Sequence, residues 1–92
     1  MGNLRLSVHS AEHTWLRELF IQRRNDLGLS QRALGKKMGV LASFIGKVET
    51  GDRRLDILEF IQYCKGLELD PVQILDDIEK QFYSTLETRK HI

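Results

Sequence analysis

Apolar residues recur every three or four positions along most of the chain, which is the spacing of amphipathic helices. After Ser10, a candidate N-cap, this spacing predicts a first helix over about residues 11–27. Ser30 is placed to cap a second, short helix that ends near residue 38. A third short helix is predicted over about residues 42–50.

Two further helices are predicted in the second half of the chain. Asp56 and Glu59 have the spacing of a capping box, which opens a fourth helix that runs to about residue 65. Pro71 suits the first position of a fifth helix, which continues to about residue 88. Together the five helices predict an all-α fold, preceded by an arm over residues 1–10 in which Leu4, Leu6 and Val8 alternate with polar neighbours.

The composition limits the class of protein. Ninety-two residues, of which 41% are hydrophobic and 29% charged, suit one globular domain. The single cysteine, Cys64, excludes a disulfide framework and a cysteine-based zinc site, and it fits a reducing cytoplasm. We expect Cys64 to be a core residue, and His9, His13 and His91 to lie on the surface without a metal. No apolar run has the length of a membrane span and no secretory leader is evident, so we expect no membrane partner.

The net charge of +1 conceals an uneven distribution. Residues 1–54 hold ten basic and five acidic residues, whereas residues 55–92 hold four basic and eight acidic ones. A positive first half can face phosphate while the acidic half faces elsewhere, so the small total does not exclude a nucleic-acid partner.

The spacing of small and apolar residues after Gln31 is that of two helices joined by a tight turn. Gly35 suits a close approach of the two helix axes, and Gly39 suits a turn that needs positive φ. Ile45 and Val48 lie three positions apart, so they can anchor the third helix and leave its opposite face exposed.

The run GLSQRALGKKMGVLASFIGKVETGDRRLD resembles the helix-turn-helix of the phage-repressor (Cro/XRE) family, and the resemblance extends over about residues 14–76. The positions in register are Gly28, Leu29, Ser30, Gln31, Leu34, Gly39, Ile45, Val48, Glu49 and Gly51. The resemblance implies a compact, five-helix, lambda-repressor-like DNA-binding domain. We expect residues 1–10 to form an N-terminal arm, 11–70 the helix-turn-helix domain and 71–92 a C-terminal helix that serves as a dimerisation element.

The resemblance also implies roles for single residues. Ser30 and Gln31, at the start of the second helix, would contact a phosphate, with plain capping as the alternative for both. Arg53 and Arg54 follow the third helix and would contact flanking phosphates.

Base readout would come from the exposed face of the third helix, at Ala42, Ser43, Gly46 and Lys47. Ala42 departs from the polar residue that similar proteins often carry. Gly46 would either allow close approach to DNA or simply weaken the helix. Phe44 can belong to the core or to the groove-facing surface.

Two further expectations concern structure and assembly. In similar proteins the residues that match Arg24 and Glu49 form a partly buried ion pair that orients the recognition helix. The fifth helix carries an apolar stripe that includes Ile78, Phe82, Tyr83 and Leu86. We expect this stripe to form a homodimer interface, with folding back onto the first helix as the alternative.

The predicted function is a cytoplasmic, sequence-specific DNA-binding transcriptional regulator that acts as a homodimer on a roughly palindromic operator. The alternative is a helix-turn-helix scaffold used mainly for protein interaction, as an antitoxin or bridging factor. We expect no enzymatic activity, no cofactor and no small-molecule ligand, because no nucleophile–base pair, metal-ligand spacing or glycine-rich phosphate loop is found.

Overall fold

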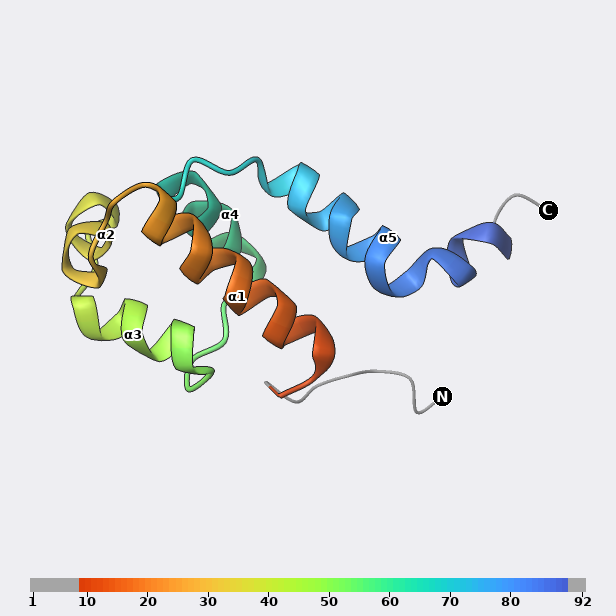
Figure 1. The fold of residues 1–92 in the computed structure, drawn as a ribbon, viewed down its shortest axis with the longest axis horizontal. Coiled ribbons are helices and arrows are strands. Elements are labelled where there is room, and N and C mark those ends of the chain that lie inside the picture. The colour runs from red at the N-terminus through yellow and green to blue at the C-terminus, as the bar shows by residue number, and fades with distance from the viewer. Residues whose placement is uncertain (1–8, 90–92) are drawn as a thin grey trace.

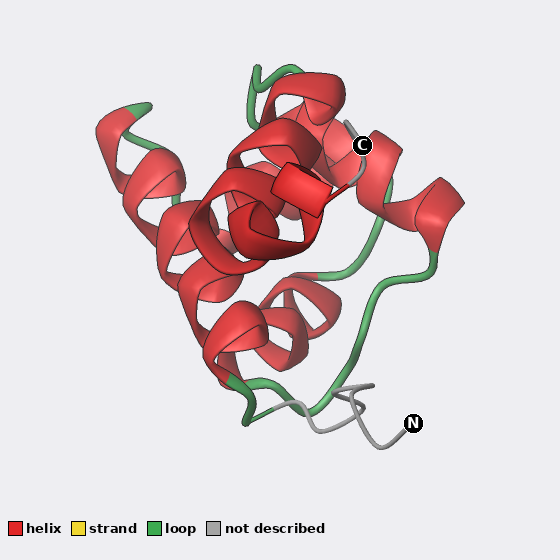
Figure 2. Cartoon of the chain, turned by 90° about the vertical axis from the view of Figure 1, so that its right-hand side faces the viewer, coloured by secondary structure: helices red, strands yellow, loops and turns green. Residues whose placement is uncertain are grey.

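The computed structural model describes the backbone of residues 9–89 and side chains as far as residue 83. Figures 1 and 2 show that this part of the chain consists of helices joined by loops, without a strand. The all-α, five-helix prediction is therefore confirmed. The elements are α1 (Ala11–Asp26), α2 (Gln31–Met38), α3 (Ala42–Thr50), α4 (Ile57–Gly66) and α5 (Pro71–Arg89).

Polar side chains cap three of the first four helices as the sequence predicts. The Ser10 hydroxyl accepts a hydrogen bond from a backbone N–H in the first turn of α1, and the Ser30 hydroxyl does the same in α2. At α4, Asp56 accepts from the Glu59 N–H at 2.8 Å, while the Glu59 carboxylate accepts from the Asp56 N–H at 2.9 Å. The exception is α3, whose N-cap is Leu41 and which has no side-chain cap.

The turn between α2 and α3 depends on two glycines. Gly35 is buried, and a Cβ at this position would lie 2.7 Å from the carbonyl oxygen of Val40. Gly39 ends α2 with φ of 76°, in the left-handed region that favours glycine. These two glycines therefore permit the close, angled packing of α2 on α3 that the sequence predicts.

One apolar core joins the five helices. Phe20 of α1 and Tyr63 of α4 stack at its centre, with ring centroids 4.8 Å apart. The buried hydrophobic residues are Phe20, Leu34, Ile45, Val48, Phe60, Tyr63, Cys64, Leu67 and Ile74. Burial raises the pKa of the Cys64 thiol to about 11, which is consistent with an unreactive core residue.

Helix α5 packs on the domain at its start and then continues along the long axis of the molecule (Figure 1). Ile74 is in the core. Further along, the ring of Phe82 meets Trp15 of α1 edge to face, with centroids 6.1 Å apart. The Tyr83 hydroxyl donates a hydrogen bond to the Glu12 carboxylate at 2.7 Å. The first helix therefore contacts α5 well beyond its first turns.

Candidate nucleic-acid interface

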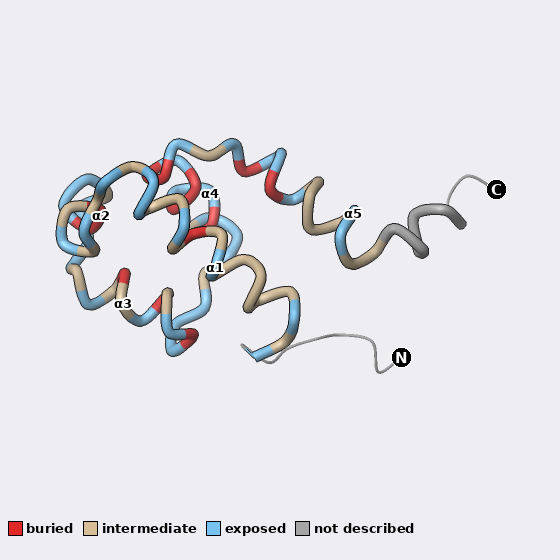
Figure 3. Tube along the Cα trace, in the orientation of Figure 1, coloured by how far each residue is buried: buried red, intermediate tan, exposed pale blue. Residues whose placement is uncertain are grey.

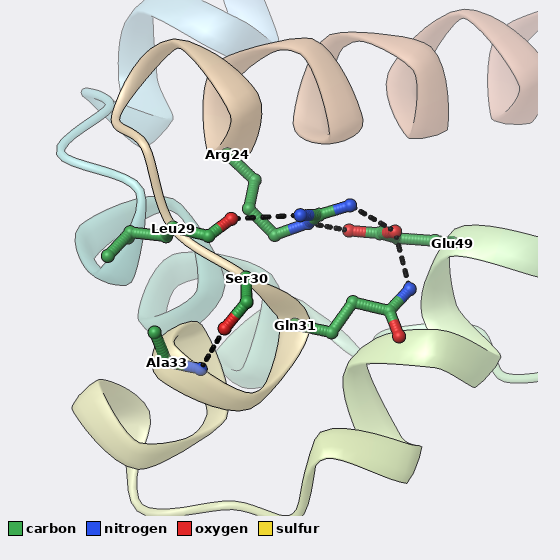
Figure 4. A network of polar contacts seen from close by, with 6 residues as sticks. All are labelled: Arg24, Leu29, Ser30, Gln31, Ala33 and Glu49. Atoms are coloured by element: carbon green, nitrogen blue, oxygen red, sulfur yellow. Dashed lines mark hydrogen bonds and ion pairs between the residues drawn. The ribbon is translucent and has the colours of Figure 1, made fainter.

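A half-buried polar network holds α3 against the first two helices (Figure 4). Arg24 donates to both carboxylate oxygens of Glu49, at 2.6 and 3.1 Å, and to the backbone oxygen of Leu29 at 2.9 Å. The side chains of Arg24 and Glu49 are only 13% and 6% exposed, and their hydrogen bond raises the pKa of the guanidinium. Gln31 adds a third link, because its Nε2 donates to Glu49 at 2.9 Å. The network therefore connects the end of α1 and the start of α2 to the last turn of α3.

Ser30 and Gln31 lie at the start of α2 with part of their hydrogen-bonding capacity already used. The Ser30 oxygen accepts from the backbone N–H of Ala33 at 3.0 Å (Figure 4), which leaves its own proton available for donation. The Gln31 amide gives one N–H to Glu49, and its second N–H is not needed for that bond. Capping and phosphate contact are thus compatible for Ser30, whereas the Gln31 side chain binds Glu49 and has one amide N–H left for a phosphate.

The two sides of α3 differ in burial, as the red and pale blue segments of Figure 3 show. Ile45 and Val48 are buried in the core, which is the anchoring predicted for them. Ser43 and Lys47 are exposed on the other side, and Ala42 is half-buried. The exposed face of α3 therefore carries two polar side chains four positions apart. The Ser43 hydroxyl can donate or accept a hydrogen bond, and the charged Lys47 amine can only donate.

Gly46 does not belong to that exposed face. A Cβ built on it would point toward the Gln31 side chain and lie 3.4 Å from the Gln31 Oε1 atom. The Gln31 side chain therefore passes Gly46 on its way to Glu49, and a Cβ at this position would make an ordinary van der Waals contact with it. This geometry does not decide between the two sequence-based alternatives for Gly46, close approach to DNA or a merely weak helix.

The two arginines after α3 have different surroundings. The Arg53 guanidinium lies 5.2 Å from the centre of the half-buried Phe44 ring and forms an ion pair with Glu59 at 2.6 Å. Arg53 is thus positioned and partly neutralised, and both arginines are exposed. The sequence assigned Glu59 only to a capping box, and no spacing signal predicts its ion pair with Arg53, because Arg53 lies six positions earlier in a loop.

The residues of the predicted dimer interface mostly contact other parts of the same chain. Ile78 is half-buried against the core, and Phe82 and Tyr83 pack on α1. The side chain of Leu86 lies outside the described part of the chain, as do Leu4, Leu6, Val8 and His91. For Phe82 and Tyr83 the structure thus shows the alternative arrangement, folding back onto the first helix.

Further apolar side chains are exposed on the two C-terminal helices. Five of the seven large hydrophobic residues that the structure shows as exposed are Ile57, Leu58, Ile61, Val72 and Leu75, here called the α4–α5 face. Ile57 and Leu75 also line a cavity of about 250 Å³, whose other walls include residues of α1 and the loop before α4. The sequence signal was the excess of apolar positions in the first turns of α4, more than one buried helix face requires.

Comparison with known proteins identifies the class of protein that this fold and interface define. A family model for the helix-turn-helix matches residues 20–74, which is more than half of the chain. An XRE-family-like protein from Pseudomonas syringae pv. tomato str. DC3000 is 33% identical, with a TM-score of 0.75, over 82% of this chain and 92% of that one. The chain belongs to the helix-turn-helix family, in its Cro/XRE-type branch, and is a DNA-binding transcription regulator.

A more distant structure agrees with this fold. A restriction-modification controller protein from Aeromonas hydrophila is 24% identical, with a TM-score of 0.60, over 66% of this chain and 88% of that one. No curated protein matches. Within the described residues, no helix is both long and apolar enough to cross a membrane, and no group of metal-ligating side chains is found.

Proposed function

We propose that the chain binds a specific, roughly palindromic DNA site as a homodimer, with α3 of each protomer in the major groove. The observation that carries this proposal is the arrangement around α3. Its inner side is fixed by Ile45, Val48 and the network at Glu49, while Ser43 and Lys47 point outward. A rigid helix that exposes hydrogen-bonding side chains is what readout of base edges requires.

The proposed phosphate contacts lie on both sides of α3. Ser30 and Gln31 stand at the start of α2, where free backbone N–H groups and the helix dipole favour an anion. Arg53 and Arg54 stand in the loop after α3. Arg53 already forms an ion pair with Glu59 at 2.6 Å. Its contact with a phosphate should therefore contribute less binding free energy than that of an arginine without such an ion pair.

Binding to duplex DNA is tested by fluorescence anisotropy at two salt concentrations, first with random sequence and then with a site selected from it. We expect affinity that falls steeply as salt increases, by close to one power of the salt concentration per phosphate contact. Lys47→Ala should change sequence preference, whereas Arg53→Ala combined with Arg54→Ala should weaken binding to all sequences alike. Affinity that is absent at low salt, or insensitive to salt, would refute the DNA-binding mode and favour the protein-interaction alternative.

For the homodimer, we propose the α4–α5 face as the interface in place of the stripe at the end of α5. Exposed apolar residues of this number on one small domain are typical of an interaction surface, and a two-fold dimer needs only one self-complementary patch. The cavity bordered by Ile57 and Leu75 offers a partner's apolar side chain a place to pack. Two recognition helices would then meet major grooves about 34 Å apart.

The dimer is tested by sedimentation equilibrium of Leu58→Glu, because Leu58 is 68% exposed and its replacement should leave the fold intact. Gln62→Glu is the matched control, since it adds the same charge to an exposed position of the same helix. We expect Leu58→Glu to be monomeric and to lose affinity for the palindrome, and Gln62→Glu to behave as the unmodified protein. A Leu58→Glu variant that stays dimeric would refute the proposed interface.

A further inference from the structure

Leu41 is the most exposed large hydrophobic residue in the described part of the chain, with 76% of its surface accessible. It occupies the N-cap of α3, a position that favours Ser, Thr, Asp or Asn. At the start of α5 the Asp70 carboxylate accepts from the Val72 N–H, so all four other helices begin with a side-chain oxygen that accepts a backbone N–H. An apolar, exposed residue here therefore serves neither the core nor the helix.

The surroundings of Leu41 connect it to the proposed reading face. Leu41, Ser43, Lys47 and Arg53 line one shallow hollow, together with Val40 and Phe44. An exposed isobutyl group thus shares a surface with the two polar side chains that α3 presents and with a guanidinium of the phosphate-contacting loop. In the helix-turn-helix docking mode, residues at the start of the recognition helix are those that reach base edges.

We infer that Leu41 is a specificity-determining residue that contacts the 5-methyl group of a thymine in each half-site. This methyl group is the apolar feature that unmodified bases present in the major groove, so it is the chemical match for an exposed leucine among hydrogen-bond donors. The inference rests on the proposed DNA binding.

The test uses the full chain and a DNA site selected from random duplexes. Each thymine of a half-site is replaced, symmetrically in both half-sites, by deoxyuridine, which removes the methyl group and keeps every hydrogen-bonding atom. We expect one position at which this replacement weakens binding by about fourfold per half-site, the value for one buried methyl-sized group. At the other thymine positions, the ratio of the dissociation constants for deoxyuridine and thymine DNA should stay near one.

Two variants test whether Leu41 causes the difference in affinity between thymine and deoxyuridine DNA. Leu41→Ser introduces a favourable N-cap, so it should raise the midpoint of unfolding while it lowers affinity for the thymine site and brings the thymine-to-uracil ratio close to one. Because stability should rise while affinity falls, loss of folding is excluded as the cause of the weaker binding. Ser43→Ala is the control, because it should weaken binding to both DNAs equally and leave the ratio unchanged.

The outcomes separate the inference from the function on which it rests. A selected half-site without thymine, a ratio near one at every position, or a ratio unchanged by Leu41→Ser would each overturn the role of Leu41 while leaving DNA binding in place. Failure of the unmodified chain to bind any duplex at low salt would overturn both.

Discussion

Replacement of Glu49 by alanine tests whether the network at the end of α3 orients the recognition helix. The substitution removes the partner of the Arg24 guanidinium and the acceptor of the Gln31 amide. Stranding one charge of a buried pair costs about 3–5 kcal/mol. Because Arg24 is 13% exposed and retains its bond to Leu29, we expect the lower end, about 3 kcal/mol, a large part of the stability of a domain this size.

Urea unfolding followed by circular dichroism measures this loss, and thermal unfolding should show a midpoint lower by about 12–24 °C. A double variant, Arg24→Met with Glu49→Met, supplies the control. Because it leaves no unpaired charge, we expect it to be more stable than the alanine variant, by at least 1 kcal/mol. A loss below 1 kcal/mol for Glu49→Ala would refute the argument that burial makes this pair matter.

Whether Glu49→Ala weakens or strengthens DNA binding distinguishes a role of Glu49 in orienting α3 from a purely electrostatic effect. Removal of Glu49 makes the basic half of the chain more positive, so electrostatics alone predicts tighter binding. Loss of the alignment of α3 predicts weaker specific binding, by about tenfold if one good base contact is lost. We expect weaker binding at a temperature where the variant is folded. Tighter binding to the selected site would refute an orienting role.

Three other substitutions test single steps of the structural argument, each by urea unfolding. Gly35→Ala should destabilise by about 1–3 kcal/mol, since its Cβ would lie 2.7 Å from the Val40 carbonyl oxygen; an unchanged stability would refute the tight turn. Gly46→Ala, whose Cβ makes only an ordinary contact with Gln31, should stabilise by up to about 1 kcal/mol, and a loss would show that Gln31 cannot adjust. The buried Tyr63 hydroxyl has no hydrogen-bond partner among the described residues, so Tyr63→Phe should cost less than about 1 kcal/mol or stabilise. Burial also raises the pKa of the Tyr63 hydroxyl, so this group ionises first in the unfolded chain, and stability should fall as pH rises above about 10. Tyr63→Phe should reduce this fall in stability. An equal fall in the variant would contradict the assignment to Tyr63.

The sequence predicts the helices well because most helix boundaries carry their own local signal. Serine or aspartate caps and the glycine ends of α2 and α3 act over three or four residues, so no knowledge of the tertiary fold is needed. The inward direction of Ile45 and Val48 also follows from spacing alone.

The side-chain partners within the interface are less predictable, since they depend on how helices pack. Gly46 was ambiguous because periodicity does not say that Gln31 would cross over it. The apolar stripe of α5 shows the same limit. Its spacing fits a partner subunit or α1 equally well, and only the contacts of Phe82 and Tyr83 distinguish the two for those residues.

The intrinsic helix signals are weakest in α3, the helix with the most specific task. It begins with leucine in place of a polar cap and contains a glycine in its interior, each of which costs about 1 kcal/mol in isolation. Its stability must therefore come from tertiary contacts, namely the two core residues and the network at Glu49. Because side chains on its outer face contribute little to folding, Ser43 and Lys47 can change without loss of the fold. Because contacts on its inner side fix its position, α3 can change the bases that it contacts through substitutions on its outer side.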